Sequence, residues 1–229
     1  MLKNNPDTEY IMVCSDVKDF KMINDIYGDE VGDRVLIKEA ELITRFAGPG
    51  SVAGRIGGDR FALCMPKEHF DESQFIDNIV AMKKEFSTGY YQMFIYIGVY
   101  GIKDRNEPVG NMCDKANMAI KCMKGNYQMA VAYYDEAILE KELEQKRLIA
   151  EFDRALENNE FCVYLQPQTD ADGLCHGAEA LVRWAHPKSG LMSPGSFVDC
   201  YERCGLIHRL DEYVWEEAVK TLRRWTELG

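Results

Sequence analysis

The glycine pair at the centre of residues 55–63, RIGGDRFAL, constrains the fold of this chain more than any other feature. Two apolar runs flank Gly57 and Gly58, and paired glycines readily adopt the positive φ angles that a tight hairpin turn requires. The segment therefore predicts a β-hairpin with the carboxylate of Asp59 at its tip. A glycine turn beside an acid is most often solvated surface, so the hairpin alone does not define a site.

A second segment, residues 10–33, changes from a strand pattern to a helical one. Its apolar run 10–14 ends just before Asp16, and apolar residues at helical spacing follow from Phe20. A strand that ends in an acid and leads into a helix is a common way to present a carboxylate to a phosphate-bound metal. This second segment strengthens the case for a site at the hairpin.

The chain resembles the GGDEF family, the diguanylate cyclases, over residues 10–134. The resemblance rests on the order D-V-K-D-F-K-M-I-N-D-I-Y-G-D-x-x-G-D, followed by G-G-D-R-F. The resemblance implies an α+β fold, the ferredoxin-like palm of nucleotidyl cyclases. The hydrophobic pattern agrees, and it predicts helices on one face of a mostly antiparallel sheet. The expected strands are 10–14, 52–56, 60–65, 92–100 and 129–134, and the expected helices are 19–27, 30–46, 70–86 and 109–123.

The resemblance also implies a set of residues for GTP and its metal, Mg²⁺ or Mn²⁺. The side chains of Asp16 and Asp59 and the backbone carbonyl of Val17 would hold the ions that bridge the phosphates. Taken singly, the nucleotide positions also suit ordinary roles, such as a helix-surface amide, an acid near a helix start or a solvated lysine. Jointly, at the family's spacing, they favour a site: Asn24 and Asp33 for the guanine edge, and Phe20, Lys21 and Lys121 for the phosphates.

The chain departs from the family at positions that serve catalysis. Arg60 replaces the second acid of the G-G-D-E-F signature, and Lys18 replaces the second acid of D-x-D. Gly125 stands where the family usually has an arginine on the triphosphate. Phosphoryl transfer needs carboxylates around its metals, so these changes argue against cyclase chemistry. Gly48 and Ser51 occupy the positions of the inhibitory R-x-x-D motif, and product feedback through that motif is not expected.

Three functions remain open for this part of the chain. The first is a degenerate GGDEF domain that binds GTP as a regulatory module. The second is a non-catalytic module for dimerisation, with a vestigial pocket. The third is an active diguanylate cyclase, which the three departures disfavour.

The last part of the chain resembles the start of an EAL domain, a cyclic di-GMP phosphodiesterase with a (β/α)₈-type barrel. The resemblance rests on residues 161–168, FCVYLQPQ, and 177–187, GAEALVRWAHP. In the expected strand 178–184, a period of two places an acid and a guanidinium on one face, where they need a ligand or each other. A structural ion pair is the alternative to a site. By resemblance, Glu179 is a metal ligand, and the positions that contact cyclic di-GMP are Gln166, Leu181 and Arg183.

The expected organisation is a degenerate GGDEF domain in residues 1–134, a connecting helix in 135–159 that also opens the next unit, and a truncated EAL domain in 160–229. A barrel of this type takes about 250 residues and builds its active site from several strands. We therefore expect phosphodiesterase activity only from a full-length parent protein. We also expect the segment after Glu160 to be loosely ordered or protected by self-association, because the faces and edge of its strands lack neighbours.

The two resemblances imply GTP, cyclic di-GMP and a second copy of the chain as partners, and the composition is compatible with them. The formal net charge of −11 argues against nucleic acid. The eight cysteines form no C-x-x-C pair and the four histidines have no ligand spacing, which favours reduced core thiols in a cytoplasmic protein. No apolar run reaches about 18 residues, so any membrane anchor is expected upstream of this chain.

Overall fold

The computed structural model describes residues 1–87, 92–124 and 130–228. The chain forms two compact units, Met1–Leu139 and Glu140–Gly229. The first unit is a five-stranded sheet with helices, and the second is a three-stranded sheet with helices.

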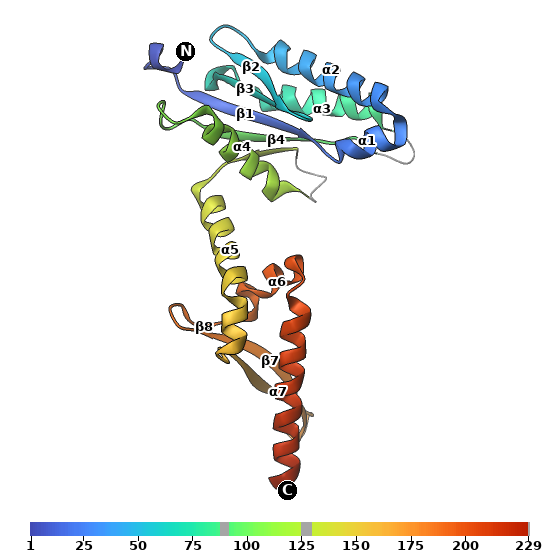
Figure 1. The fold of residues 1–229 in the computed structure, drawn as a ribbon, viewed down its shortest axis with the longest axis vertical. Coiled ribbons are helices and arrows are strands. Elements are labelled where there is room, and N and C mark those ends of the chain that lie inside the picture. The colour runs from blue at the N-terminus through green and yellow to red at the C-terminus, as the bar shows by residue number, and fades with distance from the viewer. Residues whose placement is uncertain (88–91, 125–129, 229) are drawn as a thin grey trace. The chain divides into compact units, whose positions relative to one another are not determined.

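In the first unit the strand order is β2-β3-β1-β4-β5, so the first strand of the sequence lies at the centre (Figure 1). All neighbouring strands are antiparallel except β4 and β5, which are parallel. This is the mostly antiparallel α+β arrangement that the sequence predicted. The strands are β1 (Tyr10–Val17), β2 (Val52–Gly57), β3 (Arg60–Pro66), β4 (Ile95–Gly101) and β5 (Val131–Tyr133), and the helices are α1 (Phe20–Tyr27), α2 (Asp29–Phe46), α3 (Glu72–Phe86) and α4 (Val109–Met123).

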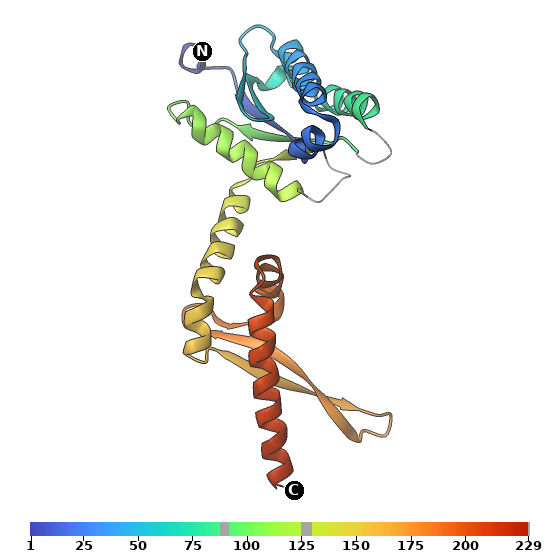
Figure 2. The ribbon, with the colours of Figure 1, turned by 45° about the vertical axis from the view of Figure 1, so that its right-hand side comes forward.

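The expectation of helices on one face of this sheet was wrong. Helices α2 and α3 cover one face, while α4 covers the other, as Figures 1 and 2 show. In β1, Ile11 and Val13 face the first core, whereas Met12 and Cys14 face the core under α4. The reason is visible in the sequence, because the run 10–14 is apolar at every position, and such a run marks a strand buried on both faces.

Three boundaries within the described residues of the first unit differ from the predicted ones by two residues or more, and the others by at most one. Strand β1 continues to Val17 because it pairs with β3 and β4 on its two sides. Strand β4 begins at Ile95, although Met93 and Phe94 before it are buried. Helix α3 begins at Glu72 because the Asp71 carboxylate accepts hydrogen bonds from the next backbone amides and caps the helix. The start of the last predicted strand, Met129, lies outside the described residues.

The second unit is an antiparallel sheet of order β6-β7-β8 packed against helices. The sequence pattern did not predict β8, which has three residues. The unit includes most of helix α5, the helix expected as a connector. Its elements are α5 (Glu136–Glu157), β6 (Phe161–Thr169), β7 (Cys175–His186), β8 (Gly190–Met192), α6 (Val198–Cys204) and α7 (Ile207–Leu228), with a short 3₁₀ turn at Pro194–Ser196.

Aromatic side chains form the core of this unit. Phe152 from α5 packs against Phe161 of β6 and Tyr201 of α6. Trp184 of β7 completes the cluster and is fully buried. The C-terminal half of α5 is therefore part of this hydrophobic core.

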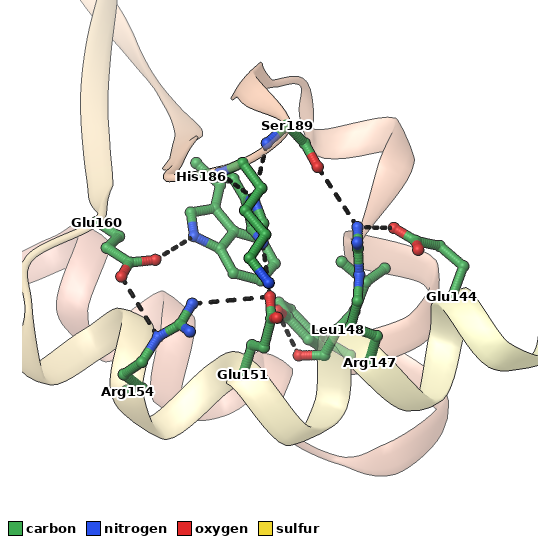
Figure 3. Close-up of polar contacts among 11 residues, drawn as sticks. Glu144, Arg147, Leu148, Glu151, Arg154, Glu160, His186 and Ser189 are labelled. Atoms are coloured by element: carbon green, nitrogen blue, oxygen red, sulfur yellow. Dashed lines mark hydrogen bonds and ion pairs between the residues drawn. The ribbon is translucent and has the colours of Figure 1, made fainter.

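A polar network on α5 holds the helix to the sheet (Figure 3). The Nε2 atom of His186 lies 2.6 Å from the Glu151 carboxylate, and Nδ1 accepts the backbone N–H groups of Lys188 and Ser189. Because Nδ1 is an acceptor, Nε2 carries the proton and donates a hydrogen bond to Glu151. Glu160 accepts from the Trp184 indole at 3.0 Å. The buried His186 is thus a structural residue, and its hydrogen bond holds the pKa of Glu151 below its ordinary value.

We expect His186→Ala to lower the stability of the second unit by about 2 to 4 kcal/mol, because it removes a buried ring and leaves Glu151 without its partner. All three tryptophans lie after residue 139, so tryptophan fluorescence in urea reports on this unit. His208→Ala, at an exposed position of α7, is the matched control. Equal midpoints for the two variants would contradict the structural role of His186.

Candidate nucleotide and metal site

The predicted hairpin is present and places its acid beside the end of β1. Strands β2 and β3 meet at a turn of Gly58 and Asp59, where Gly57 and Gly58 have φ values of +145° and +60°. The Arg55 side chain donates to the Gly58 carbonyl at 2.7 Å and closes the turn. Arg60 pairs in register with Asp16, so Asp59 lies next to the pair that joins the hairpin to β1.

Positive side chains surround the two predicted metal-binding carboxylates. Lys124 Nζ lies 3.3 Å from Asp16 Oδ2. Burial raises the pKa of Asp59, and the Asp16 charge raises it further, while Lys124 and Arg60 oppose the rise. The two acids therefore lie close enough to repel each other, and a cation between them is favourable.

The connection from β1 to α1 is a tight turn. The Lys18 amide donates to the Phe94 carbonyl at 2.8 Å, and the Lys18 ammonium lies 3.4 Å from Asp19. Asp19 has a φ of +51°, a left-handed conformation that Asp tolerates better than most residues. Helix α1 then begins at Phe20, and the first N–H groups of a helix are available to an anion. The predicted phosphate contacts at Phe20 and Lys21 thus belong to a helix start.

The Asn24 side chain occupies space on the facing helix α2 that is free because Gly32 has no side chain. A Cβ atom built on Gly32 would overlap Asn24 Oδ1 and lie 3.2 Å from the Phe20 ring. Only glycine at this position lets the Asn24 amide lie against α2. Within the described residues Asn24 Oδ1 is buried and has no hydrogen-bond partner. A buried acceptor without a donor costs free energy, so this amide is a polar group that the described residues leave unsatisfied.

Asp33 follows Gly32 on α2 and faces a cleft between this helix and the hairpin. The cleft has a volume of about 470 Å³ and is lined also by Leu36, Arg55 and Phe61. Asn24 and Asp33 are therefore brought to the same end of α2, one from each helix. The predicted Lys121 is exposed in the last turn of α4, and Gly125 lies outside the described residues.

Two residues of this region were not predicted, Lys124 and Glu39. The signal for Lys124 was its place one helical turn after Lys121, at the end of the same helix. The signal for Glu39 was a charge inside an apolar stripe, because Val35 and Ile43 lie four residues before and after it and both are buried.

Glu39 is buried behind the site and shares a hydrogen bond with Ser15, whose hydroxyl donates to Glu39 Oε1. The other carboxylate oxygen has no partner in the part of the chain that the structure describes. Burial raises the pKa of Glu39 to about 8, although the bond from Ser15 acts in the opposite direction. The charges of Asp59 and Asp16 contribute to this rise. Glu39 is therefore largely protonated at neutral pH.

Glu39 makes the stability of the first unit depend on pH. Above its ordinary pKa the unfolded chain ionises Glu39, but the folded chain keeps the proton, so unfolding releases it. Stability should then fall as pH rises from about 5 to about 8, by at most about 1.4 kcal/mol per pH unit.

Hydrogen exchange of first-unit amides at increasing urea concentration gives the stability of this unit at each pH. The change of that stability with pH is the slope to be measured. Glu39→Gln keeps an acceptor for Ser15 and should reduce the slope. Glu41→Gln, an exposed acid on the same helix, should retain it. The same slope in both variants would show that another group is responsible.

The donors fit a metal ion that takes most of its ligands from phosphate and water. Over residues 1–87, 92–124 and 130–228, no three His, Cys, Asp or Glu side chains converge on one point. Asp16 and Asp59 supply two carboxylates, and Mg²⁺ commonly binds through one or two carboxylates plus substrate phosphates. The residues thus suit such an ion better than a metal held by protein side chains alone.

The predicted residues of the second unit share one face of the β6-β7 ribbon. Gln166 lies directly opposite Glu179, and Leu181 lies opposite Tyr164. The Arg183 guanidinium is 5.7 Å from the centre of the Tyr164 ring and donates to the Val182 carbonyl. Among the described residues no ion pair joins Glu179 to Arg183, so the alternative of a structural pair is not supported.

Family comparisons agree with this geometry. The model of the family "Diguanylate cyclase, GGDEF domain" matches residues 2–129, and the EAL domain model matches residues 149–229. The chain therefore belongs to the GGDEF domain family and carries EAL domain sequence after it. Domains of both families generally use divalent metal ions.

Several similar proteins are bacterial signalling proteins. The bifunctional diguanylate cyclase/cyclic di-GMP phosphodiesterase MucR of Pseudomonas aeruginosa is 28% identical over 228 residues, which cover 97% of this chain and 33% of MucR. The signaling protein YkoW of Bacillus subtilis is 30% identical over 226 residues, 93% of this chain and 28% of YkoW. A structure of the S helix, GGDEF and EAL regions of Vibrio cholerae LapD, bound to c-di-GMP, is 15% identical with a TM-score of 0.46, over 95% of this chain and 52% of that one.

This chain spans about a third of the length of the curated relatives it matches. None of the helices in the described ranges combines the length and apolar character that crossing a bilayer requires.

Proposed function

We propose that the first unit is a GGDEF domain that binds GTP with a divalent cation, has lost cyclase activity, and regulates an EAL phosphodiesterase domain of the whole protein. The observation that carries this proposal is the charge around Asp16. Arg60 stands opposite it in the sheet, and Lys124 pairs with it. Positive side chains thus occupy the place where a two-metal reaction needs acids, while the base side of the site retains its acceptors.

The base side supports GTP as the nucleotide. Asn24 Oδ1 is a buried acceptor that has no donor among the described residues, and the Asp33 carboxylate is a second acceptor at the same end of α2. The Watson–Crick edge of guanine carries adjacent N–H donors, which two acceptors can bind. Adenine presents an unprotonated ring nitrogen there, so the same pair disfavours ATP.

The phosphate side supplies positive charge from several elements. The start of α1 offers backbone N–H groups, and α4 brings Lys121 and Lys124 to the same region. Asp16, Asp59 and the Val17 carbonyl would hold the divalent cation, which would neutralise phosphate charge. Lys124 and that cation compete for the Asp16 carboxylate.

The catalytic side argues against phosphoryl transfer. An arginine guanidinium stays protonated in proteins, so Arg60 can neither ligate a metal nor accept a proton from an attacking hydroxyl. Lys18 adds a further positive charge at the end of β1 and pairs with Asp19. The site keeps acceptors and positive charges that suit nucleotide binding. It lacks the additional acids that phosphoryl transfer requires.

For the second unit we propose that the face of Gln166, Glu179, Leu181 and Arg183 belongs to a cyclic di-GMP site of the whole protein. Glu179 is exposed on this face and would hold a divalent metal ion. Arg183, on the same side of the ribbon, suits a phosphate. Hydrolysis would need groups from further strands, as in any barrel of this type.

We expect calorimetry to detect GTP binding in the presence of Mg²⁺. Asn24→Ala should weaken binding about ten-fold or more, since losing a buried hydrogen-bond partner costs about 1 to 3 kcal/mol. Asn111→Ala, at an exposed position of α4, should bind like the wild type. If the wild type gives no heat at millimolar GTP, the domain is better explained as a dimerisation module.

We also expect no cyclic di-GMP from GTP and Mg²⁺, measured by mass spectrometry of the products. Arg60→Glu alone should restore little activity, because Lys18 and Gly125 still differ from the family pattern. Robust turnover by the unmodified chain would show that the domain is an active cyclase.

A further inference from the structure

Three cysteines from separate parts of the chain gather under helix α4. Cys14 on β1 and Cys64 on β3 lie on the sheet face that α4 covers, and Cys113 lies on the helix itself. Strand register makes Cys14 and Cys64 diagonal neighbours, because Met12 pairs with Cys64. None of the three belongs to the nucleotide site.

Helix α4 approaches the sheet closely at this point because of a glycine. Gly98 on β4 pairs in register with Cys14, and a Cβ at Gly98 would overlap the Ala116 carbonyl. Cys113, one helical turn before Ala116, is thereby brought onto Cys14. The Cys14 Sγ lies 3.8 Å from the Cys113 carbonyl oxygen, to which its S–H donates.

A groove connects this cluster to the surface. It has a volume of about 640 Å³, and Met12, Cys64, Val109, Met112 and Cys113 line it. Cys14 does not line it and is fully buried. A small uncharged oxidant can therefore meet Cys113 before Cys14. The neighbouring Cys14 side chain also lowers the pKa of Cys113, and the thiolate is the reactive form.

We propose that Cys113 and Cys14 form a reversible disulfide bond, with a peroxide as the oxidant. The Cys113 thiolate attacks one peroxide oxygen and breaks the O–O bond, which gives a sulfenic acid and, after protonation, water. The Cys14 sulfur then attacks Cys113 Sγ, expels the sulfenic oxygen as a second water and loses its proton. Two thiols are oxidised by two electrons in total, and one peroxide is reduced to two waters.

The disulfide would join α4 to the central strand. Cys14 lies two residues before Asp16, and the same helix carries Lys121 and Lys124 at its end. The bond would hold both elements at the separation that Gly98 permits. A thiol reductant would reverse it.

The test uses the full chain, reduced, treated with hydrogen peroxide, alkylated and digested without reductant for mass spectrometry. We expect one linked peptide pair that contains Cys14 and Cys113, lacks two hydrogens and disappears with dithiothreitol. Cys122→Ser, an exposed thiol on the same helix, should leave the yield unchanged.

Two further variants distinguish the chemistry from misfolding. Cys14→Ser removes the resolving thiol, so dimedone should trap a sulfenic acid on Cys113 in greater yield than in the wild type. Cys64→Ser should retain the linked pair. The proposal is overturned by a wild type without the linked pair, by a bond between Cys64 and Cys113 in its place, or by peroxide products confined to the exposed cysteines.

Discussion

The burial of strand β1 on both faces is the constraint on which the first unit depends. The strand pairs on both sides, packs against α2 and α3 on one face, and packs against α4 on the other. An element fixed in four directions has little freedom at its end, and Asp16 stands at that end. The hairpin, the start of α1 and the end of α4 are each positioned relative to this one strand. The position of the site is therefore set by the core behind it.

Charge at the end of β1 is balanced by the protein itself. Two acids, Asp16 and Asp59, face Arg60 from the hairpin and Lys124 from α4, while the nearby Glu39 is protonated at neutral pH. A domain that relied on metal ions alone would leave these acids to repel one another. In this chain the repulsion is already reduced by side chains. Such a site can keep its folded geometry with or without nucleotide, which suits a binding role.

The sequence was sufficient for the hairpin, the strand and helix order and the family. These follow from local signals, namely paired glycines, periodicity and motif spacing. It was insufficient for the Ser15–Glu39 bond and the Asp16–Lys124 ion pair, because each joins side chains from elements far apart in the chain. It also missed β8, whose three residues are too few to show a period. The expected placement of α4 was wrong because the run 10–14 is apolar at every position, which marks a strand buried on both faces.

Gly32 has a consequence for how variation in this protein should be interpreted. The residue contributes no functional group, yet the amide of Asn24 occupies the space where its side chain would be. An alanine there would displace a predicted base-recognition residue without altering any ligand-contacting atom. In a sequence survey, loss of this glycine would therefore be as informative about guanine preference as loss of Asn24 itself. Inheritance of the pair as a unit would be the evolutionary signature of a pocket still under selection.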